Sequence, residues 1–205
     1  MSIRYRTILS TLDKQIEVVQ SKTYNTNSIA ALGSININFD TPPKVGNKII
    51  IMVGCDQIRG NNLVGGTTIL FSSGTSLPGR VWETNDYSNV YTIQNTSAGT
   101  GTFRIVMIEI KNCSSVIGIE SLVVTDTTIT SSPTNVNKDE MILVFLYKQA
   151  AQLASATNSF NEIIQNIQVS AWNRLYTTNE LAQTTTLSYI GTAQLMRHYT
   201  LKLIP

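Results

Sequence analysis

Apolar and polar residues alternate with a period of two along most of this chain, in short runs separated by turn-forming residues. Residues 34–40 (SININFD) place Ile35, Ile37 and Phe39 on one face and polar side chains on the other. Successive side chains of a strand point to opposite faces, so this alternation is typical of a half-buried strand. The pattern predicts an antiparallel all-β protein, a β-sandwich.

Two segments are apolar on both faces, which predicts central strands. Residues 47–53 read NKIIIMV, and residues 102–111 read TFRIVMIEIK, with one polar residue on each otherwise apolar face. The other predicted strands are residues 63–71, bent at Gly65 and Gly66, and residues 80–84, 87–94, 116–125, 140–147, 162–170, 172–177, 185–190 and 194–204. Helix-favouring residues cluster only at 148–156, which predicts a short helical turn there, and residues 11–20 fit either a helix or a strand.

The chain carries two weakly similar halves, at about residues 34–113 and 120–205. The run VGNKIIIMV resembles VNKDEMILVFL, the segment around Trp82 resembles that around Trp172, and TFRIVMIEIK corresponds to LMRHYTLKLI. Two units are too few for a stacked repeat array, so we expect two half-sandwiches with matched strand order. The expected organisation is an N-terminal arm or attachment segment at residues 1–27 and one β-sandwich domain at residues 28–205.

Composition narrows the class of protein. The 205 residues are 42% apolar and only 14% charged, with a net charge of +2 and no run of basic residues. This argues against disorder and against a nucleic-acid partner. No stretch is long and apolar enough to span a membrane, and the first residues do not resemble a signal peptide, so we expect no membrane partner.

The two cysteines, Cys55 and Cys113, stand far apart without metal-ligand or redox spacing. A disulfide between them is the less favoured of two alternatives, because nothing in the sequence indicates an oxidising compartment. We expect no metal and no cofactor.

Catalytic chemistry has few candidate residues. His198 is the single histidine and lies within a strand pattern, where a surface or edge position is expected. Two acid pairs, Glu83 with Asp86 and Asp139 with Glu140, are close in sequence but lie at predicted turns, where solvated charges are the simpler explanation. The sequence therefore predicts no catalytic residues and a protein that is not an enzyme.

Glu109 lies on an otherwise apolar strand face and is expected either to face a ligand or to pair with a basic residue of a neighbouring strand. Trp82, Tyr87 and Tyr91 form an aromatic set that could stack on the apolar faces of sugars, giving a possible carbohydrate-binding site. Aromatic residues of a sandwich more often belong to its core.

Three features follow one another along the chain: P-x-x-G-N-x-I-I-I at residues 43–51, a Trp and D-x-x-x-x-Y segment at residues 82–91, and a Gly-Thr-rich turn into a strand that contains Glu109. This order resembles the jelly-roll sandwich domains of tailed-bacteriophage structural proteins. The resemblance covers most of residues 34–204. It implies a jelly-roll-like fold and carries no catalytic residue over.

The resemblance also implies a virion component, most simply a capsid decoration or cement protein or another exterior assembly protein. The alternative is a tail fibre or a receptor-binding, carbohydrate-binding module. The expected partners are other virion structural proteins and further copies of this chain, with a surface glycan as a possible ligand. The expected location is the virion, assembled in the host cytoplasm.

Overall fold

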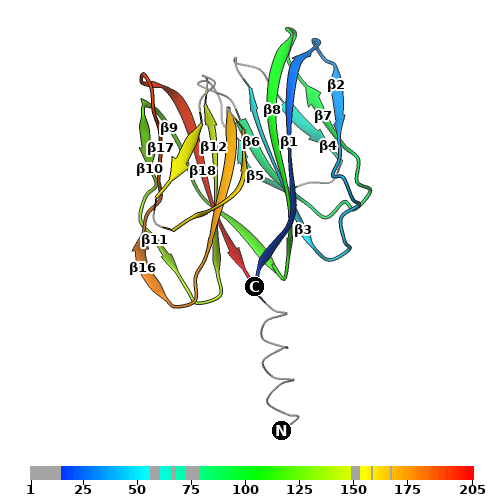
Figure 1. Ribbon diagram of the computed structural model, residues 1–205. Helices are drawn as coiled ribbons and strands as arrows, with labels where there is room; N and C mark the ends of the chain where they lie inside the picture. The colour runs from blue at the N-terminus through cyan, green and yellow to red at the C-terminus, as the bar shows by residue number, and fades with distance from the viewer. Residues whose placement is uncertain are drawn as a thin grey trace.

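The computed structural model describes residues 15–55, 61–65, 68–72, 79–148, 153–157, 159–166 and 168–205, and these form strands and connections without a helix. Figure 1 shows the first half of the chain, blue to green, beside the second half, green to red. The strands of the first half are β1 (Glu17–Ile29), β2 (Ser34–Ile37), β3 (Lys48–Cys55), β4 (Asn61–Val64), β5 (Thr68–Ser72), β6 (Gly79–Thr84), β7 (Tyr91–Asn95) and β8 (Gly101–Lys111).

The second half repeats this series with two additional short strands. Its strands are β9 (Ser115–Asp126), β10 (Thr128–Thr130), β11 (Thr134–Val136), β12 (Met141–Lys148), β13 (Ala154–Ala156), β14 (Asn161–Gln165), β15 (Val169–Leu175), β16 (Glu180–Gln183), β17 (Thr186–Tyr189) and β18 (Gln194–Ile204). The additional pair, β11 and β16, forms a two-stranded sheet of its own.

Each half has the strand order of a jelly roll. In the first half a five-stranded sheet, sheet A, has the order β1-β8-β3-β6-β5, and a three-stranded sheet, sheet B, has the order β2-β7-β4. An eight-stranded jelly roll pairs its strands as 1-8-3-6 and 2-7-4-5. The first half follows this scheme, except that its fifth strand pairs with the sixth in the larger sheet.

The second half follows the same scheme. Sheet C has the order β9-β18-β12-β15-β14, and sheet D has the order β10-β17-β13. Register confirms the correspondence, because Ile51 lies opposite both Trp82 and Met107 in sheet A, while Val144 lies opposite both Trp172 and Thr200 in sheet C. All the strand pairs are antiparallel, and the expected antiparallel, jelly-roll-like sandwich is confirmed.

The sheets stack as four layers with three apolar cores between them. The alternating side chains of sheets A and C divide between two faces. The central core joins sheets A and C through residues such as Ile50, Val106, Leu143 and Leu201. The two outer cores lie between sheets A and B and between sheet C and the small sheets of the second half.

The predicted central strands are confirmed, since β3 lies between β8 and β6, and β8 lies between β1 and β3. The first half begins earlier than expected. Residues 17–27 of the predicted arm belong to β1, which pairs with β8 along most of its length, and residues 1–14 lie outside the described residues. The sequence SKTYNTN is polar enough to resemble an exposed segment, yet Thr and Tyr favour strands.

Other boundaries differ as well. The predicted strand at residues 162–170 is two strands, β14 and β15, and the predicted helical turn at residues 148–156 contains β13 in its described part. The expected bend near Gly65 is confirmed, because Gly65 has a φ of +98° between β4 and β5. A side chain would be strained at that dihedral angle.

Aromatic rings pack directly on glycines across the central core. A Cβ atom added to Gly54 of β3 would lie 2.5 Å from the ring of Tyr147 on β12. A Cβ atom at Gly79 would lie 2.4 Å from the hydroxyl of Tyr199, and one at Gly118 of β9 would lie 2.9 Å from the ring of Phe71. These glycines allow the two halves to approach more closely than any other residue would permit.

The same turn geometry precedes β3 and β12, and the two halves stabilise it with different residues. In the first half the amide of Asn47 donates to the carbonyl of Lys44, and Gly46 has a φ of +95°, as expected for a type II turn. The buried Glu109 carboxylate of β8 accepts hydrogen bonds from the Lys44 amide (2.8 Å), from Asn47 Nδ2 (2.6 Å) and from Gln20 Nε2 (2.6 Å).

In the second half the turn is the same but the carboxylate is within it. The amide of Glu140 donates to the carbonyl of Asn137, and Asp139 takes a positive φ of +68°. The Glu140 carboxylate accepts from the Asn137 amide and Nδ2 and contacts Lys202 Nζ at 3.5 Å. Because Lys202 lies opposite Ile142 as Glu109 lies opposite Ile49, the pair Asn47 and Glu109 of one half is replaced by Glu140 and Lys202 in the other.

We expect Gly54→Ala to destabilise the protein by about 1–3 kcal/mol, because its Cβ atom would collide with the Tyr147 ring in a closely packed core. The free energy of unfolding, from urea titration, measures the effect. In the double variant Gly54→Ala/Tyr147→Ala the collision is absent, so its loss should be smaller than the sum of the two single losses. Additive losses would contradict a direct contact between these positions.

Exchanging the turn residues between halves tests their equivalence. Glu109→Lys should cost about 3 kcal/mol or more, because it removes the acceptor of three hydrogen bonds and buries a cation. Asn47→Glu alone should also destabilise, by adding a second carboxylate. The double variant Asn47→Glu/Glu109→Lys reproduces the pair of the second half and should recover more than half of the summed loss. A double variant as unstable as that sum would contradict the equivalence.

Candidate functional site

The second jelly roll has an open pocket between the edges of its two sheets. It lies where β13, the edge strand of sheet D, faces β14, the edge strand of sheet C. In a complete jelly roll the fifth strand would lie beside the fourth. Here β14 pairs with β15 instead, so the side of β13 opposite β17 has no neighbouring strand among the described residues, and a pocket of about 440 Å³ remains.

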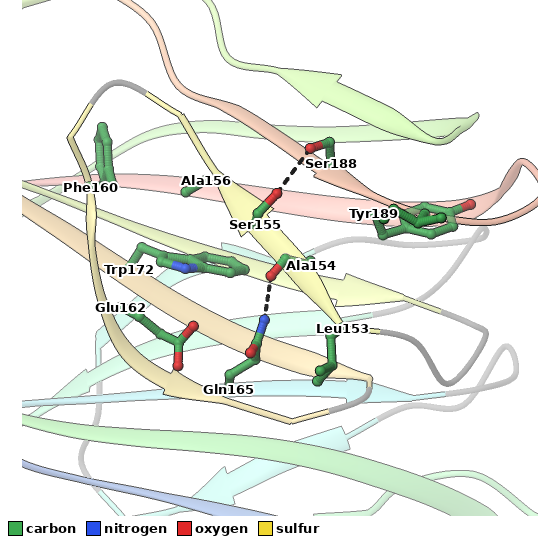
Figure 2. A pocket seen from close by; sticks show the side chains of 11 residues that line it. Leu153, Ala154, Ser155, Ala156, Phe160, Glu162, Gln165, Trp172, Ser188 and Tyr189 are labelled. Atoms are coloured by element: carbon green, nitrogen blue, oxygen red, sulfur yellow. Dashed lines mark hydrogen bonds between the residues drawn. The ribbon is translucent and has the colours of Figure 1, made fainter.

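Aromatic and aliphatic side chains form much of the pocket wall. Trp172 projects from β15, Tyr189 from the end of β17, and Phe160 from the connection that leads into β14 (Figure 2). Trp172 and Tyr189 are almost fully buried, whereas Phe160 is partly exposed. Two largely exposed aliphatic residues, Leu153 and Ile190, lie at the rim.

Polar side chains line the same pocket. Gln165 of β14 donates its side-chain amide to the carbonyl of Ala154, which ties the two strand edges together (Figure 2). The hydroxyls of Ser155 and Ser188 lie 3.1 Å apart on neighbouring strands. Glu162 is exposed, and it is the one charged side chain among the described residues that line the pocket. The pocket therefore combines ring surfaces, hydroxyl groups, an amide and one carboxylate.

A buried lysine lies beside this pocket. The Nζ atom of Lys148 is 5.7 Å from the centre of the Tyr189 ring, within cation–π distance. Among the described residues it has no hydrogen-bond partner, and burial lowers the pKa of Lys148 to about 8. The Lys148 amine therefore lies against the ring of Tyr189, and Lys148 is not among the residues that line the pocket.

His198 differs from its expected position. It is fully buried on β18 between β12 and β9, opposite Leu146 and Leu122, rather than at the surface or an edge. The expectation failed because alternation alone does not reveal that β18 is covered by the small sheets of the second half. Nε2 lies 3.2 Å from the Thr200 hydroxyl, and burial lowers the pKa of His198 to about 4. The ring is therefore neutral at pH 7.

The three aromatic residues expected to form a sugar platform are not assembled on an exposed surface. Trp82 is fully buried and Tyr91 is 2% exposed, and both belong to the core between sheets A and B. Tyr87 packs against this core, and its hydroxyl donates to the carbonyl of Asn47. Their burial counts against a carbohydrate platform at these residues.

The other candidate groups have structural partners. Glu109 accepts hydrogen bonds from the turn before β3, and among the described residues its hydrogen-bond partners are the Lys44 amide, Asn47 and Gln20 and include no basic side chain. Glu83 forms a salt bridge with Lys48 at 2.6 Å, and Asp86 accepts a bond from the Ser88 amide. Burial raises the pKa of Glu140, whereas hydrogen bonds from Asn137 and Lys202 lower it. The net result is a lowered pKa.

Cys55 and Cys113 are not joined by a disulfide, and they lie buried in different cores. Burial raises the pKa of the Cys113 thiol to about 11, which leaves it protonated and poorly nucleophilic at neutral pH. Within the described ranges, no three or more His, Cys, Asp or Glu side chains gather in a way that could hold a metal ion. The part of the chain that the structure describes contains no helix long and apolar enough to cross a membrane.

The pocket was not evident from the sequence. In the sequence Trp172 stands out only as the counterpart of Trp82, Tyr189 belongs to the predicted strand at residues 185–190, and Phe160 lies in an otherwise polar segment. One signal is an isolated Phe in the polar stretch at residues 157–162, since exposed aromatic residues often mark binding sites. Nothing in the strand pattern shows that β14 would leave β13 uncovered.

Comparison with known proteins gives little further information. No family model matches the chain, and no curated protein matches it. Among solved structures it is similar to the major capsid protein P2 of bacteriophage PM2, with 8% identity, a TM-score of 0.28, and coverage of 90% of this chain and 97% of that one.

Two further solved structures are weakly similar. HutD from Pseudomonas fluorescens SBW25 has 10% identity and a TM-score of 0.29, over 93% of this chain and 100% of that chain. The PBSX exported protein XepA has 10% identity and a TM-score of 0.27, over 93% and 87%. Likenesses this weak carry no argument about function. Strand order and register define the chain as an antiparallel double sandwich of two jelly-roll-like halves, with an open pocket in the second.

The free energy of unfolding should decrease as the pH falls from 6.5, the model-peptide pKa of histidine, to about 4. In this range the unfolded chain binds a proton at His198, whereas the folded chain keeps the ring neutral. The loss should reach up to about 3 kcal/mol. His198→Ile, which introduces the residue found at the equivalent Ile105, should flatten this part of the pH dependence. Unfolding free energies of the two proteins at pH 7 and pH 4.5 test this. A constant difference between them would contradict a neutral buried histidine.

Proposed function

We propose that the protein is a structural component of a virion, a capsid decoration or cement protein or another exterior assembly protein. The observation that carries the proposal is the fusion of two jelly-roll-like halves through a shared central core. Jelly rolls recur in viral capsids, and this is an analogy at the level of fold. The five-stranded sheets of the two halves pack face to face in one buried apolar core, which supports a single compact block over two tethered modules.

The charged groups are consistent with a building block. Most acidic side chains of the described chain hold strands and turns in place. Examples are the pairs Glu17 with Lys111, Glu83 with Lys48, and Glu180 with Arg174, and the bonds that Glu109, Glu120 and Glu140 accept from turn residues. Such groups stabilise the geometry of strands and turns, which supports a structural role. The proposal therefore includes no catalytic activity.

Assembly requires surfaces that contact neighbours, and the protein exposes several large apolar side chains. Ile190 is 95% exposed, Val45 78% and Leu181 76%. They lie on connections and at the edge pair β11 and β16, where a neighbouring subunit could cover them. The proposed partners are other virion structural proteins and further copies of this chain.

A second candidate is a receptor-binding, carbohydrate-binding module of a tail fibre. The open pocket between β13 and β14 favours it, because that pocket presents rings and polar groups together. The two roles are compatible, since a rigid exterior block can also carry a ligand site.

We expect the protein to co-purify with virus particles made by a host that carries its gene, at a fixed copy number per particle. Quantitative mass spectrometry of gradient-purified particles, with cryo-EM comparison of particles that lack the gene, measures this. Abundant protein in the lysate together with its absence from purified particles would overturn the proposal.

The predicted attachment segment can be tested in the same assay. Deletion of residues 2–14 leaves β1 intact, whereas deletion of residues 1–27 would remove most of β1 and uncover β8. The shorter deletion should leave the unfolding free energy nearly unchanged and reduce incorporation. If this variant is incorporated normally, residues 2–14 are not needed for attachment, and the virion proposal is unaffected.

A further inference from the structure

We propose that the pocket between β13 and β14 is a binding site for one neutral pyranose unit of a surface polysaccharide. This inference rests on the receptor-binding candidate and is independent of where the protein lies in a particle. The pocket volume of about 440 Å³ falls within the usual range for small-molecule sites, roughly 300–1,000 Å³.

The wall chemistry matches the two kinds of surface on a pyranose. The carbon–hydrogen faces of a sugar ring are apolar and pack on aromatic and aliphatic groups, which the partly exposed Phe160 and the exposed Leu153 supply. The hydroxyl groups of a sugar need both donors and acceptors. Glu162 supplies carboxylate acceptors, and the hydroxyls of Ser155 and Ser188 can each donate and accept.

The charge of the pocket selects among sugars. Glu162 is the only charged side chain among the described lining residues, and the nearby Lys148 is buried behind Tyr189 without lining the pocket. An acidic sugar would bring a second carboxylate close to Glu162, which lines the pocket itself, and this is unfavourable. The site therefore discriminates against uronic and sialic acids.

An added peptide strand fits the pocket less well than a small ligand. Strand addition needs a free row of backbone groups along a sheet edge. The edge strand β13 has three residues, and the Gln165 side chain already donates to its Ala154 carbonyl. This hydrogen bond occupies a backbone group of β13 that an added strand would need, and the pocket stays open.

The first jelly roll lacks the carboxylate of this site. Glu162 lies opposite Trp172, and the residue opposite Trp82 at the equivalent place is Ile69. The inference therefore gives one sugar site per chain, in the second half only. It also provides a matched control, because Ile69 is exposed and occupies the corresponding edge.

Binding can be measured with methyl glycosides of glucose, galactose, mannose, N-acetylglucosamine and glucuronic acid, by saturation-transfer NMR on the full chain. At least one neutral glycoside should bind with a Kd of about 1–10 mM, as expected for one small, weakly held ligand. Methyl glucuronide should not bind. The saturating stoichiometry should be one per chain.

Variants locate the site. Glu162→Gln and Phe160→Ala should each weaken binding of that glycoside by about tenfold, since each removes a group that contacts the sugar. Ile69→Ala should leave binding unchanged, and unfolding curves show whether every variant is folded. The proposal is overturned if no neutral glycoside binds, if methyl glucuronide binds as tightly, or if binding survives both pocket variants. Particle incorporation is measured separately, so either proposal can fail alone.

Discussion

The face-to-face packing of sheets A and C is the contact on which the rest of the structure depends. Each five-stranded sheet is apolar on both faces, so neither half can leave its inner face in water without exposing a row of large side chains. In this contact the ring of Tyr147 lies on Gly54, and these two residues occupy equivalent positions in their halves. Equivalent positions meet where a two-fold arrangement places its axis. Two tyrosines would collide there, so the sequence carries a tyrosine in one half and a glycine in the other.

The two halves also differ in the residues of their outer cores. The first half keeps its outer core apolar, with Cys55 and Ile105 where the second half has Lys148 and His198. Buried groups of this kind reduce stability, because burial disfavours the charged form of each. A fold with a large shared core can tolerate such losses. The second half thus has a lysine and a histidine buried in its outer core, together with an additional strand pair and the open pocket, while the first half has apolar residues at those two positions.

Strand patterning predicts the architecture because it depends on local alternation. Residues 47–53 and 102–111 identified two central strands, and the paired segments around Trp82 and Trp172 lie at equivalent places on β6 and β15. Short strands such as β10, β11, β13 and β16 were missed because segments of three or four residues are too short to show a period. The site was missed for a different reason. An alternating strand presents rings to one face. Whether that face becomes core or pocket depends on which other sheet covers it, and the strands of that sheet are distant in sequence. The burial of Trp82 and Tyr91 illustrates this.

The pocket follows from one change of strand partner. Because β14 pairs with β15, sheet C gains an edge strand and sheet D has β13 at its edge. In the first half β5 makes the same change beside β6, with Ile69 at the position of Glu162. Departure of the fifth strand is therefore a property of both halves and is not by itself a sign of function. What distinguishes the second half is the side chains placed at the opening, an acid, an amide and two hydroxyls around aromatic rings. If this opening only completed the apolar core, apolar side chains there would be the more stable choice. The combination found at the opening instead suits a ligand with both apolar and hydroxyl surfaces.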